Sequence, residues 1–240
     1  MSSPDLAIKT GGRELVQQAS ALYADSFRTD PVITYILHNI PEAKRLAYLP
    51  KYFDALITAA ALNDASFTEI DEFKCCVTMM PPGKKVDNPF TMIQAGLLSM
   101  LWNIGWGPCW RMIFEFSPMT DRCKRKGMPG IKNYYYVFFT ATHTSARGQG
   151  LCPKLLKHWQ EISARDKFPL WLEATTEKSM RVYSRCGFEI VEELRLGKGK
   201  VGTNGLPIDA AGRKSAKEEL VGVPIWGMVW WPEGTKPVVK

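Results

Sequence analysis

The residues best suited to bind an anion form the turn after the strand predicted over 134–142. The turn, Arg147-Gly148-Gln149-Gly150-Leu151-Cys152, leads into a predicted amphipathic helix over 153–165. Glycine lets successive backbone N–H groups converge on one point, and a helix start adds unpaired N–H groups and the positive end of its dipole. The turn therefore predicts a pyrophosphate site, although an ordinary helix entry has the same pattern. It is not a Walker loop, because no Gly-Lys-Ser/Thr follows.

Other residues carry groups that could transfer protons. Glu173 lies near the end of the strand predicted over 169–174. It could be a general base or an amine anchor, or simply pair with a neighbouring lysine or arginine. His143 follows the strand before the turn, where it is expected to cap the phosphate loop, and Glu115 is a weaker candidate for a base. Cys152 lies at a helix start, but the sequence places no histidine to activate it, so we expect it to pack.

The elements that position these residues alternate between strands and helices. Strands are predicted over 134–142, 169–174, 188–196 and 223–231, and helices over 153–165 and 177–186. Strand, helix and strand in succession imply a right-handed crossover that feeds a mostly antiparallel sheet. The lysine- and glycine-rich stretch 197–222 has no periodicity and predicts a mobile insertion.

The first half of the chain is predicted to be more helical. Helices are predicted over 15–27 and 41–62, the second interrupted at Pro50, followed by short strands over 67–70 and 74–80 and a basic loop over 121–132. No internal repeat and no domain boundary is evident. We therefore predict a single domain over 1–240.

One uncharged stretch, 88–110, is long enough to cross a bilayer as a helix. Because prolines stand near both ends and polar residues and glycines lie within it, we expect a buried helix with a loop instead. Trp102, Trp106 and Trp110 recur at every fourth residue, which predicts a core stripe or the wall of a substrate cleft.

The order of these motifs resembles the GCN5-related N-acetyltransferase (GNAT) superfamily. The resemblance covers 134–196: a strand, Arg-x-x-Gly-x-Cys, an amphipathic helix, an apolar strand with Glu173, a short helix and Tyr183-x-x-x-Gly187-Phe188. The family's phosphate motif is Gln/Arg-x-x-Gly-x-Gly/Ala, so Cys152 departs from it at the last place. More narrowly, WLEATTEKSMRVYSRCGF is similar to the puromycin acetyltransferase branch and its small-molecule relatives.

The resemblance implies a fold, a cofactor and site residues. The implied fold is α/β (α+β), a twisted and mostly antiparallel sheet with helices on both faces and a splayed central strand pair. The implied cofactor is acetyl-CoA, with no metal, and the reaction is direct transfer to an amine without an acyl-enzyme. Tyr183 falls at the family's acid position, a packing tyrosine being the alternative, and Glu173 is our first choice for the base. The cofactor-binding residues implied are Phe139, Thr140, Ala141 and Thr142 for the pantetheine, and Arg147, Gly148, Gln149, Gly150, Leu151 and Cys152 for the pyrophosphate.

The resemblance also implies N-acetylation of a small molecule, a xenobiotic or secondary metabolite, for detoxification or self-resistance. A protein lysine or N-terminal acetyltransferase, a non-catalytic acyl-CoA-binding module and O-acetylation are the alternatives. The chain has 240 residues and a net charge of +7, which favours anionic partners. Because acetyl-CoA itself is anionic, this charge requires no nucleic acid, and we expect no membrane partner either. A monomer and a homodimer are equally compatible with the sequence.

The cysteines indicate the compartment. The chain has six, with no C-x-x-C pair and no zinc-site spacing, and it begins with a polar stretch instead of an apolar leader. Scattered free thiols are typical of a reducing environment. We therefore predict a cytoplasmic protein, with a nuclear location as the alternative.

Overall fold

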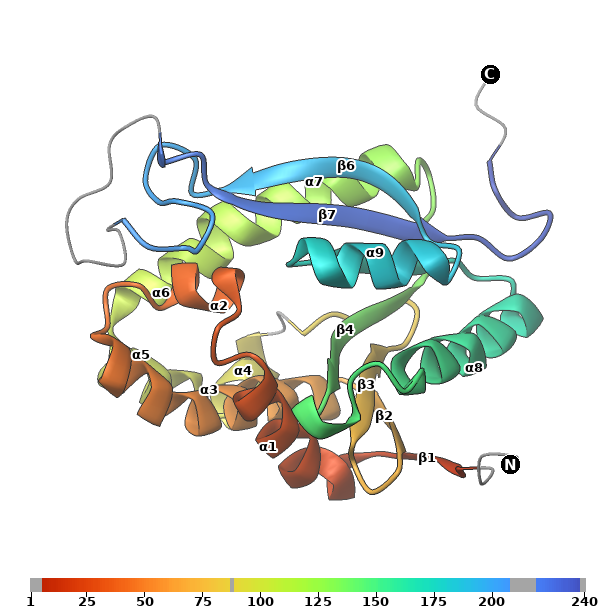
Figure 1. Cartoon of the computed structure of the whole chain (residues 1–240), viewed down its shortest axis with the longest axis horizontal. Helices are drawn as coiled ribbons and strands as arrows, with labels where there is room; N and C mark the ends of the chain where they lie inside the picture. The colour runs from red at the N-terminus through yellow and green to blue at the C-terminus, as the bar shows by residue number, and fades with distance from the viewer. Residues whose placement is uncertain (1–5, 87–88, 208–218, 238–240) are drawn as a thin grey trace.

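A single mixed sheet organises the molecule (Figure 1). The computed structural model describes residues 6–86, 89–207 and 219–237. Within these, seven strands lie in the order β1-β2-β3-β4-β5-β7-β6, and only the β4–β5 pair is parallel. The predicted mixed fold with a mostly antiparallel sheet is therefore confirmed. The strands are β1 (Ile8–Gly11), β2 (Ser66–Ile70), β3 (Cys75–Met80), β4 (Tyr135–Thr142), β5 (Leu170–Ala174), β6 (Glu189–Leu196) and β7 (Val223–Trp230).

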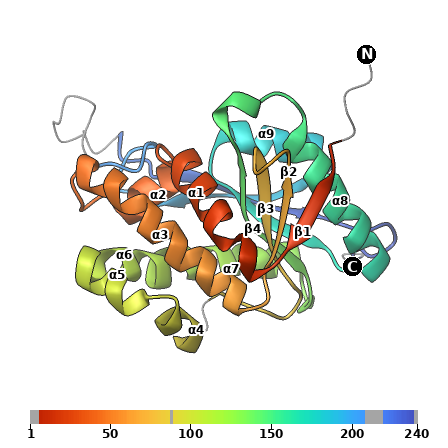
Figure 2. The ribbon, with the colours of Figure 1, turned by 90° about the horizontal axis from the view of Figure 1, so that it is seen from below.

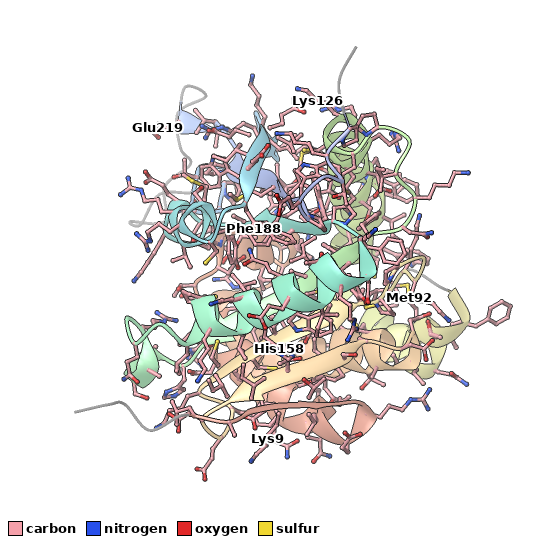
Figure 3. The ribbon with its side chains drawn as sticks, turned by 90° about the vertical axis from the view of Figure 1, so that its right-hand side faces the viewer. Lys9, Met92, Lys126, His158, Phe188 and Glu219 are labelled. Carbon is pink, nitrogen blue, oxygen red and sulfur yellow. The ribbon has the colours of Figure 1, made fainter. Side chains whose placement is uncertain are left out.

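Helices cover both faces of the sheet, as predicted (Figure 2). Successive side chains of strand β3 point to opposite faces of the sheet. Cys76 packs in the core with the first helices, whereas Cys75 and Val77 pack in the core with α8. Figure 3 looks onto the α8 side, with His158 on that helix and Phe188 just before β6. The first face carries α1 (Val16–Ser26), α2 (Pro31–Ile36), α3 (Glu42–Leu62) and α7 (Ser117–Gly127), and the second carries α8 (Leu151–Asp166) and α9 (Glu177–Arg185).

Strands β4 and β5 separate soon after they meet. Their parallel pairing joins Tyr135 to Leu170 and Tyr136 to Trp171 and then stops. By contrast, β4 continues to pair with β3 as far as Thr142. Beyond Tyr136, the edge of β4 that faces β5 therefore has no strand partner. This is the splayed central pair that the resemblance implies.

The first 62 residues differ from the prediction in two helices. Pro50 lies inside α3 without ending it, because Leu49 and Phe53 on either side are buried and anchor the helix to the core. The prediction that Pro50 interrupts this helix is therefore wrong. The chain also forms α2, which we did not predict. Asp30 caps α2 by accepting the N–H groups of Val32 and Ile33 at 2.9 and 3.0 Å.

The basic segment 121–132 is largely helical instead of a loop. A π-helical turn, η2 (Arg111–Phe116), runs directly into α7, which ends at Gly127. Thr120 and Cys123 are buried on α7, while Lys126 on the exposed side pairs with Glu192 of β6. Packing of this buried side against β6 and β7 outweighs the composition that predicts a loop.

The uncharged stretch forms three short helices, α4 (Pro89–Gln94), α5 (Leu97–Ile104) and α6 (Trp106–Trp110). Met100 and Ile104 occupy the buried side of α5, so the tryptophans face outward. Trp102, Trp106 and Trp110 are 93%, 74% and 57% exposed, and the prediction of a core stripe or cleft wall is wrong. Among the described residues, no helix is both long and apolar enough to span a bilayer.

The stretch 197–222 is described in part. Val201 is fully buried, and Gly205 lies against the backbone of Pro31 with no room for a side chain. Lys200 reaches Glu115 at 3.0 Å. The described part therefore packs on α2, while 208–218 lie outside the described residues. For those residues, mobility stays a prediction.

Candidate active site

A cavity of about 580 Å³ lies at the gap between β4 and β5. Because this gap joins the two faces of the sheet, the cavity has walls on both. One end, which we call the donor end, is formed by α8, α9 and the turn before α8. The other, the acceptor end, is formed by α2, α3, η2 and the residues before α2. Residues at the donor end include Arg147, Gly148, Gly150, Cys152 and Tyr183; residues at the acceptor end include Asp30, Ile33, Ile36, Tyr52, Leu56 and Met112.

The donor end begins with the glycine turn. Gly148 and Gly150 have φ values of +82° and +77°, and Gly150 is the N-cap of α8. A β-carbon at either glycine would meet open space, so the turn leaves a concavity that side chains would fill. The N–H groups of Leu151 and Cys152 begin α8 and have no acceptor within the helix. This arrangement fits a diphosphate.

Three basic side chains line the cavity. Arg147 lines the cavity, and its Nε donates to the carbonyl oxygen of Thr142 at 3.3 Å. Lys178 and Arg185 of α9 line it too, and sequence reasoning missed both. Their spacing of seven residues, two helical turns on the predicted helix 177–186, is the signal that could have found them. Three cations in the walls of one cavity suit the phosphates of coenzyme A.

Strand β4 forms the wall between the two ends. Phe139, Thr140, Ala141 and Thr142 all line the cavity along the edge that β5 leaves unpaired. Tyr23 beneath the strand donates to the carbonyl oxygen of Phe139 at 3.3 Å. The four residues implied for the pantetheine therefore lie together on one cavity wall.

Tyr183 and Cys152 meet at the donor end. Tyr183 is 8% exposed, and burial, with the neighbouring Cys152 and Cys75 thiols, raises the pKa of its hydroxyl well above the usual range. The hydroxyl therefore stays protonated and can donate a hydrogen bond. A hydrogen bond with Cys75, together with burial, raises the pKa of the Cys152 thiol. A protonated thiol is a poor nucleophile, which agrees with a packing role for Cys152.

Glu173 lines the cavity, but its carboxylate already has partners. Tyr136 Oη donates to Oε2 and Trp171 Nε1 donates to Oε1, each at 2.7 Å. Lys124 Nζ lies 3.5 Å from Oε1. Burial opposes the charge of this lysine, but Glu173, Tyr134 and Asp121 together more than compensate and raise the pKa of Lys124. Of the roles considered for Glu173, the paired carboxylate is the one that these contacts support.

Asp30 is another cavity residue that sequence reasoning missed. Its side chain lines the acceptor end and is almost fully buried, at 8% exposure. Its Oδ1 caps α2, and its Oδ2 accepts from the Thr175 hydroxyl at 2.5 Å. Burial outweighs these hydrogen bonds and raises the pKa of Asp30 to about 6. The sequence Thr29-Asp30-Pro31, just after the helix predicted over 15–27, holds the signal, an N-cap before proline.

The remaining candidates lie away from the reacting centre. His143 is exposed and accepts from the Ser145 N–H at 3.3 Å, so it caps the short helix η3 (Thr144–Ala146) before the glycine turn, as expected. Glu115 accepts from Tyr35 Oη at 2.5 Å and holds Lys200. Neither is a wall residue of the cavity. In the part of the chain that the structure describes, no group of His, Cys, Asp or Glu residues is arranged to hold a metal.

Known proteins resemble the chain in sequence and in fold. No family model matches it. An uncharacterized N-acetyltransferase of Schizosaccharomyces pombe is 21% identical over 181 residues, 75% of this chain and 73% of that protein.

Three solved structures cover nearly the whole chain. A histone acetyltransferase and related acetyltransferase from Corynebacterium glutamicum has a TM-score of 0.60 and 16% identity, covering 98% of this chain and 99% of that one. A polyamine N-acetyltransferase of Drosophila melanogaster has a TM-score of 0.57 and 15% identity, covering 95% and 100%. Arylalkylamine N-acetyltransferase 2 of Aedes aegypti has a TM-score of 0.55 and 12% identity, covering 95% and 99%.

These likenesses show that the chain has the fold of the N-acetyltransferases named above. The fold and the N-acetyltransferase relative agree with the resemblance to the GNAT superfamily that the motifs indicate. The site residues of the donor end also fit the coenzyme A that this superfamily uses, because the concavity, the helix start and the cations match its phosphates.

Proposed function

We propose that the chain is an acetyl-CoA-dependent N-acetyltransferase, a single GNAT domain that acts on the amine of a small molecule. The observation that carries the proposal is the cavity through the β4–β5 gap, which has a diphosphate cradle at one end and a buried carboxylate at the other. Its volume of about 580 Å³ lies in the range of small-molecule sites.

Acetyl-CoA supplies the activated acyl group, and the residues of the donor end hold it. The N–H groups of the turn and of the start of α8 bind the diphosphate, and the basic side chains neutralise the phosphates. The free edge of β4 offers N–H and C=O groups to the pantetheine and one N–H to the thioester carbonyl. The residues proposed for this task are Phe139, Thr140, Ala141, Thr142, Arg147, Gly148, Gln149, Gly150, Leu151 and Cys152, with Lys178 and Arg185 added from the structure.

Two protons have to move, one at each end. An alkylamine resembles lysine, so only about one molecule in a thousand is neutral at pH 7. Asp30, with its pKa of about 6, is mostly ionised at that pH, attracts the ammonium and accepts its proton. Tyr183, which stays protonated, donates to the sulfur that leaves. Glu173 shapes the wall through its bonds to Tyr136 and Trp171.

Three observations support a small amine over a protein substrate. Apolar residues of α2, α3 and η2 close the acceptor end, residues 171–188 resemble the puromycin acetyltransferase branch, and neighbouring structures are named for agmatine, polyamines and arylalkylamines. Action on xenobiotic or secondary-metabolite amines agrees with all three. All six cysteines are free, which supports a reducing compartment such as the cytoplasm or the nucleus.

The test measures release of coenzyme A thiol with a panel of small primary amines and, separately, with histone and N-terminal peptides. We expect turnover with small amines and at least tenfold lower kcat/KM with peptides. Preference for peptides would favour a protein acetyltransferase instead. Acetyl-CoA binding by calorimetry without turnover of any acceptor would favour a non-catalytic module. Mass spectrometry of the products of amino alcohols distinguishes N- from O-acetylation.

A further inference from the structure

A second, smaller cavity lies behind the acceptor end. Its volume is about 60 Å³, room for roughly four water-sized groups. It lies between α3 and the helices α4 to α6, which group together beside α3 in Figure 2. Its walls are almost entirely carbon and sulfur, from Ile36, Tyr52, Ala55, Leu56, Ala59, Val86, Met92, Ala95, Met100, Pro108, Cys109, Met112 and Ile113.

Four residues line both cavities, and one of them is polar. They are Ile36, Tyr52, Leu56 and Met112. Tyr52 is 2% exposed, and its hydroxyl has no hydrogen-bond partner among the residues that the structure describes. A buried hydroxyl without a partner is costly, and a ligand that pairs with it recovers that cost. Because Tyr52 lines both cavities, its side chain lies at the boundary between them.

Tyr52 and Asp30 lie within electrostatic range of each other. Burial, the Cys109 thiol and the Asp30 carboxylate all raise the pKa of Tyr52, so its hydroxyl stays protonated. Both residues line the acceptor end. One acceptor molecule can therefore meet a carboxylate and, beyond it, a neutral hydroxyl.

The charges of the walls limit what the acceptor can carry. Over the described residues, the acidic groups lining the two cavities are Asp30 and Glu173. Lys124 already balances the charge of Glu173, whereas the hydrogen-bond donors to Asp30 are all neutral, so Asp30 is the carboxylate left for an ammonium. The second cation of a diamine or of agmatine would lie against carbon and sulfur without a counter-charge, which is unfavourable.

We infer that the acceptor is a monoamine whose apolar body bears a neutral hydrogen-bonding group such as a hydroxyl, with its ammonium at Asp30 and this group at Tyr52. The inference rests on the proposed function and adds the substrate class. Tyr52 is then the residue that determines specificity. It separates this chain from neighbouring folds whose names refer to agmatine and polyamines.

The test compares kcat/KM for phenylethylamine, its three ring-hydroxylated isomers and agmatine. The variants are Tyr52→Phe and, as a matched control, Tyr48→Phe, which alters a tyrosine of the same helix outside both cavities. In the unaltered chain we expect at least one hydroxylated isomer to exceed phenylethylamine by about threefold to tenfold, the worth of one neutral hydrogen bond. Agmatine should be poorer than phenylethylamine by about a hundredfold or more.

Tyr52→Phe should abolish the preference for the hydroxyl, lower kcat/KM for the best hydroxylated isomer more than for phenylethylamine, and keep or raise Tm, because it removes an unpaired buried group. Tyr48→Phe should keep the preference. The inference is overturned if agmatine matches the best monoamine, if no isomer exceeds phenylethylamine, or if Tyr52→Phe lowers all amines equally. Turnover of every amine at one rate overturns the inference alone, whereas turnover of none overturns the proposed function with it.

Discussion

The two ends of the main cavity are built in different ways. The donor end comes from one continuous stretch, in which β4, the glycine turn, α8, β5 and α9 follow one another from Tyr135 to Arg185. The acceptor end is assembled from the residue before α2, from α2 and α3, and from η2, which begins at Arg111. A local motif therefore specifies the first end, whereas tertiary packing specifies the second.

This difference fits the chemistry of the two ligands. A diphosphate is recognised by backbone N–H groups and charge, which glycines and a helix start provide locally. An acceptor amine is recognised by the shape of an apolar chamber and one carboxylate, and both depend on how distant helices pack. We therefore expect substitutions at the donor end to weaken the affinity for acetyl-CoA. Substitutions at the acceptor end should instead lower kcat/KM for the amine.

The largest effect is expected at the acceptor end. Asp30→Asn keeps an oxygen that caps α2, but it removes the charge that attracts the ammonium and takes its proton. We expect kcat/KM for the amine to fall by about a hundredfold to a thousandfold, the usual worth of a general base. Steady-state kinetics with varied amine at saturating acetyl-CoA measure this kcat/KM. As a control, calorimetry should give an unchanged Kd for acetyl-CoA.

The matched variant is Glu173→Gln, since Glu173 is the other carboxylate of the cavity. Because Lys124 already balances the charge of Glu173, whereas the partners of Asp30 are neutral, we expect a smaller loss than for Asp30→Asn. If Glu173→Gln causes the larger loss and Asp30→Asn retains activity, Glu173 is the base, as the sequence predicts.

The sequence predicts the donor end well because its parts are local. The glycine turn, the strand before it and Tyr183 follow one another in the order that the chemistry needs, and the structure brings their residues to one cavity, except that Gln149 of the turn is not a wall residue. The basic side chains of α9 were missed only because the spacing of Lys178 and Arg185 was not used.

Gly150→Val should produce the next largest effect. Valine at a φ of +77° is strained, and its side chain enters the concavity proposed for the diphosphate. We expect the Kd for acetyl-CoA to rise by about tenfold to a hundredfold, measured by calorimetry.

Its control is Gly130→Val, because Gly130 has a similar φ of +75°, equally open surroundings and no place in the cavity wall. Both variants should lose similar stability, but only Gly150→Val should lose affinity. Equal Kd values for the two would remove the turn from the cofactor site.

Tyr183→Phe should have a moderate effect. The change removes the only hydroxyl of this side chain while keeping the ring that packs in the core. We expect kcat to fall by about tenfold with little change in the KM for acetyl-CoA, because the hydroxyl acts as the sulfur leaves. Steady-state kinetics with varied acetyl-CoA measure both constants. An intact kcat would leave Tyr183 as a packing residue.

The acceptor end was largely hidden from the sequence for physical reasons. The Thr29-Asp30-Pro31 triplet both ends one helix and begins another, and only the structure shows that the Asp30 carboxylate is buried. The spacing of Trp102, Trp106 and Trp110 suits a helix but does not say which side faces the core. Burial of Met100 and Ile104 decides that, and it depends on segments far away in the chain.

The smallest expected effect is a dependence on pH. Since the pKa of Asp30 is raised to about 6, the carboxylate loses its charge as the pH falls through that value, and its contribution to catalysis is lost with it. The ionisation of the amine affects kcat/KM of the wild type and of Asp30→Asn equally, so it cancels in the ratio of the two values. We expect this ratio to be constant above about pH 7 and to fall to about half near pH 6. A midpoint near pH 4 would mean that Asp30 is not buried as in the structure. A ratio that does not change with pH would mean that a group other than Asp30 accepts the proton of the amine.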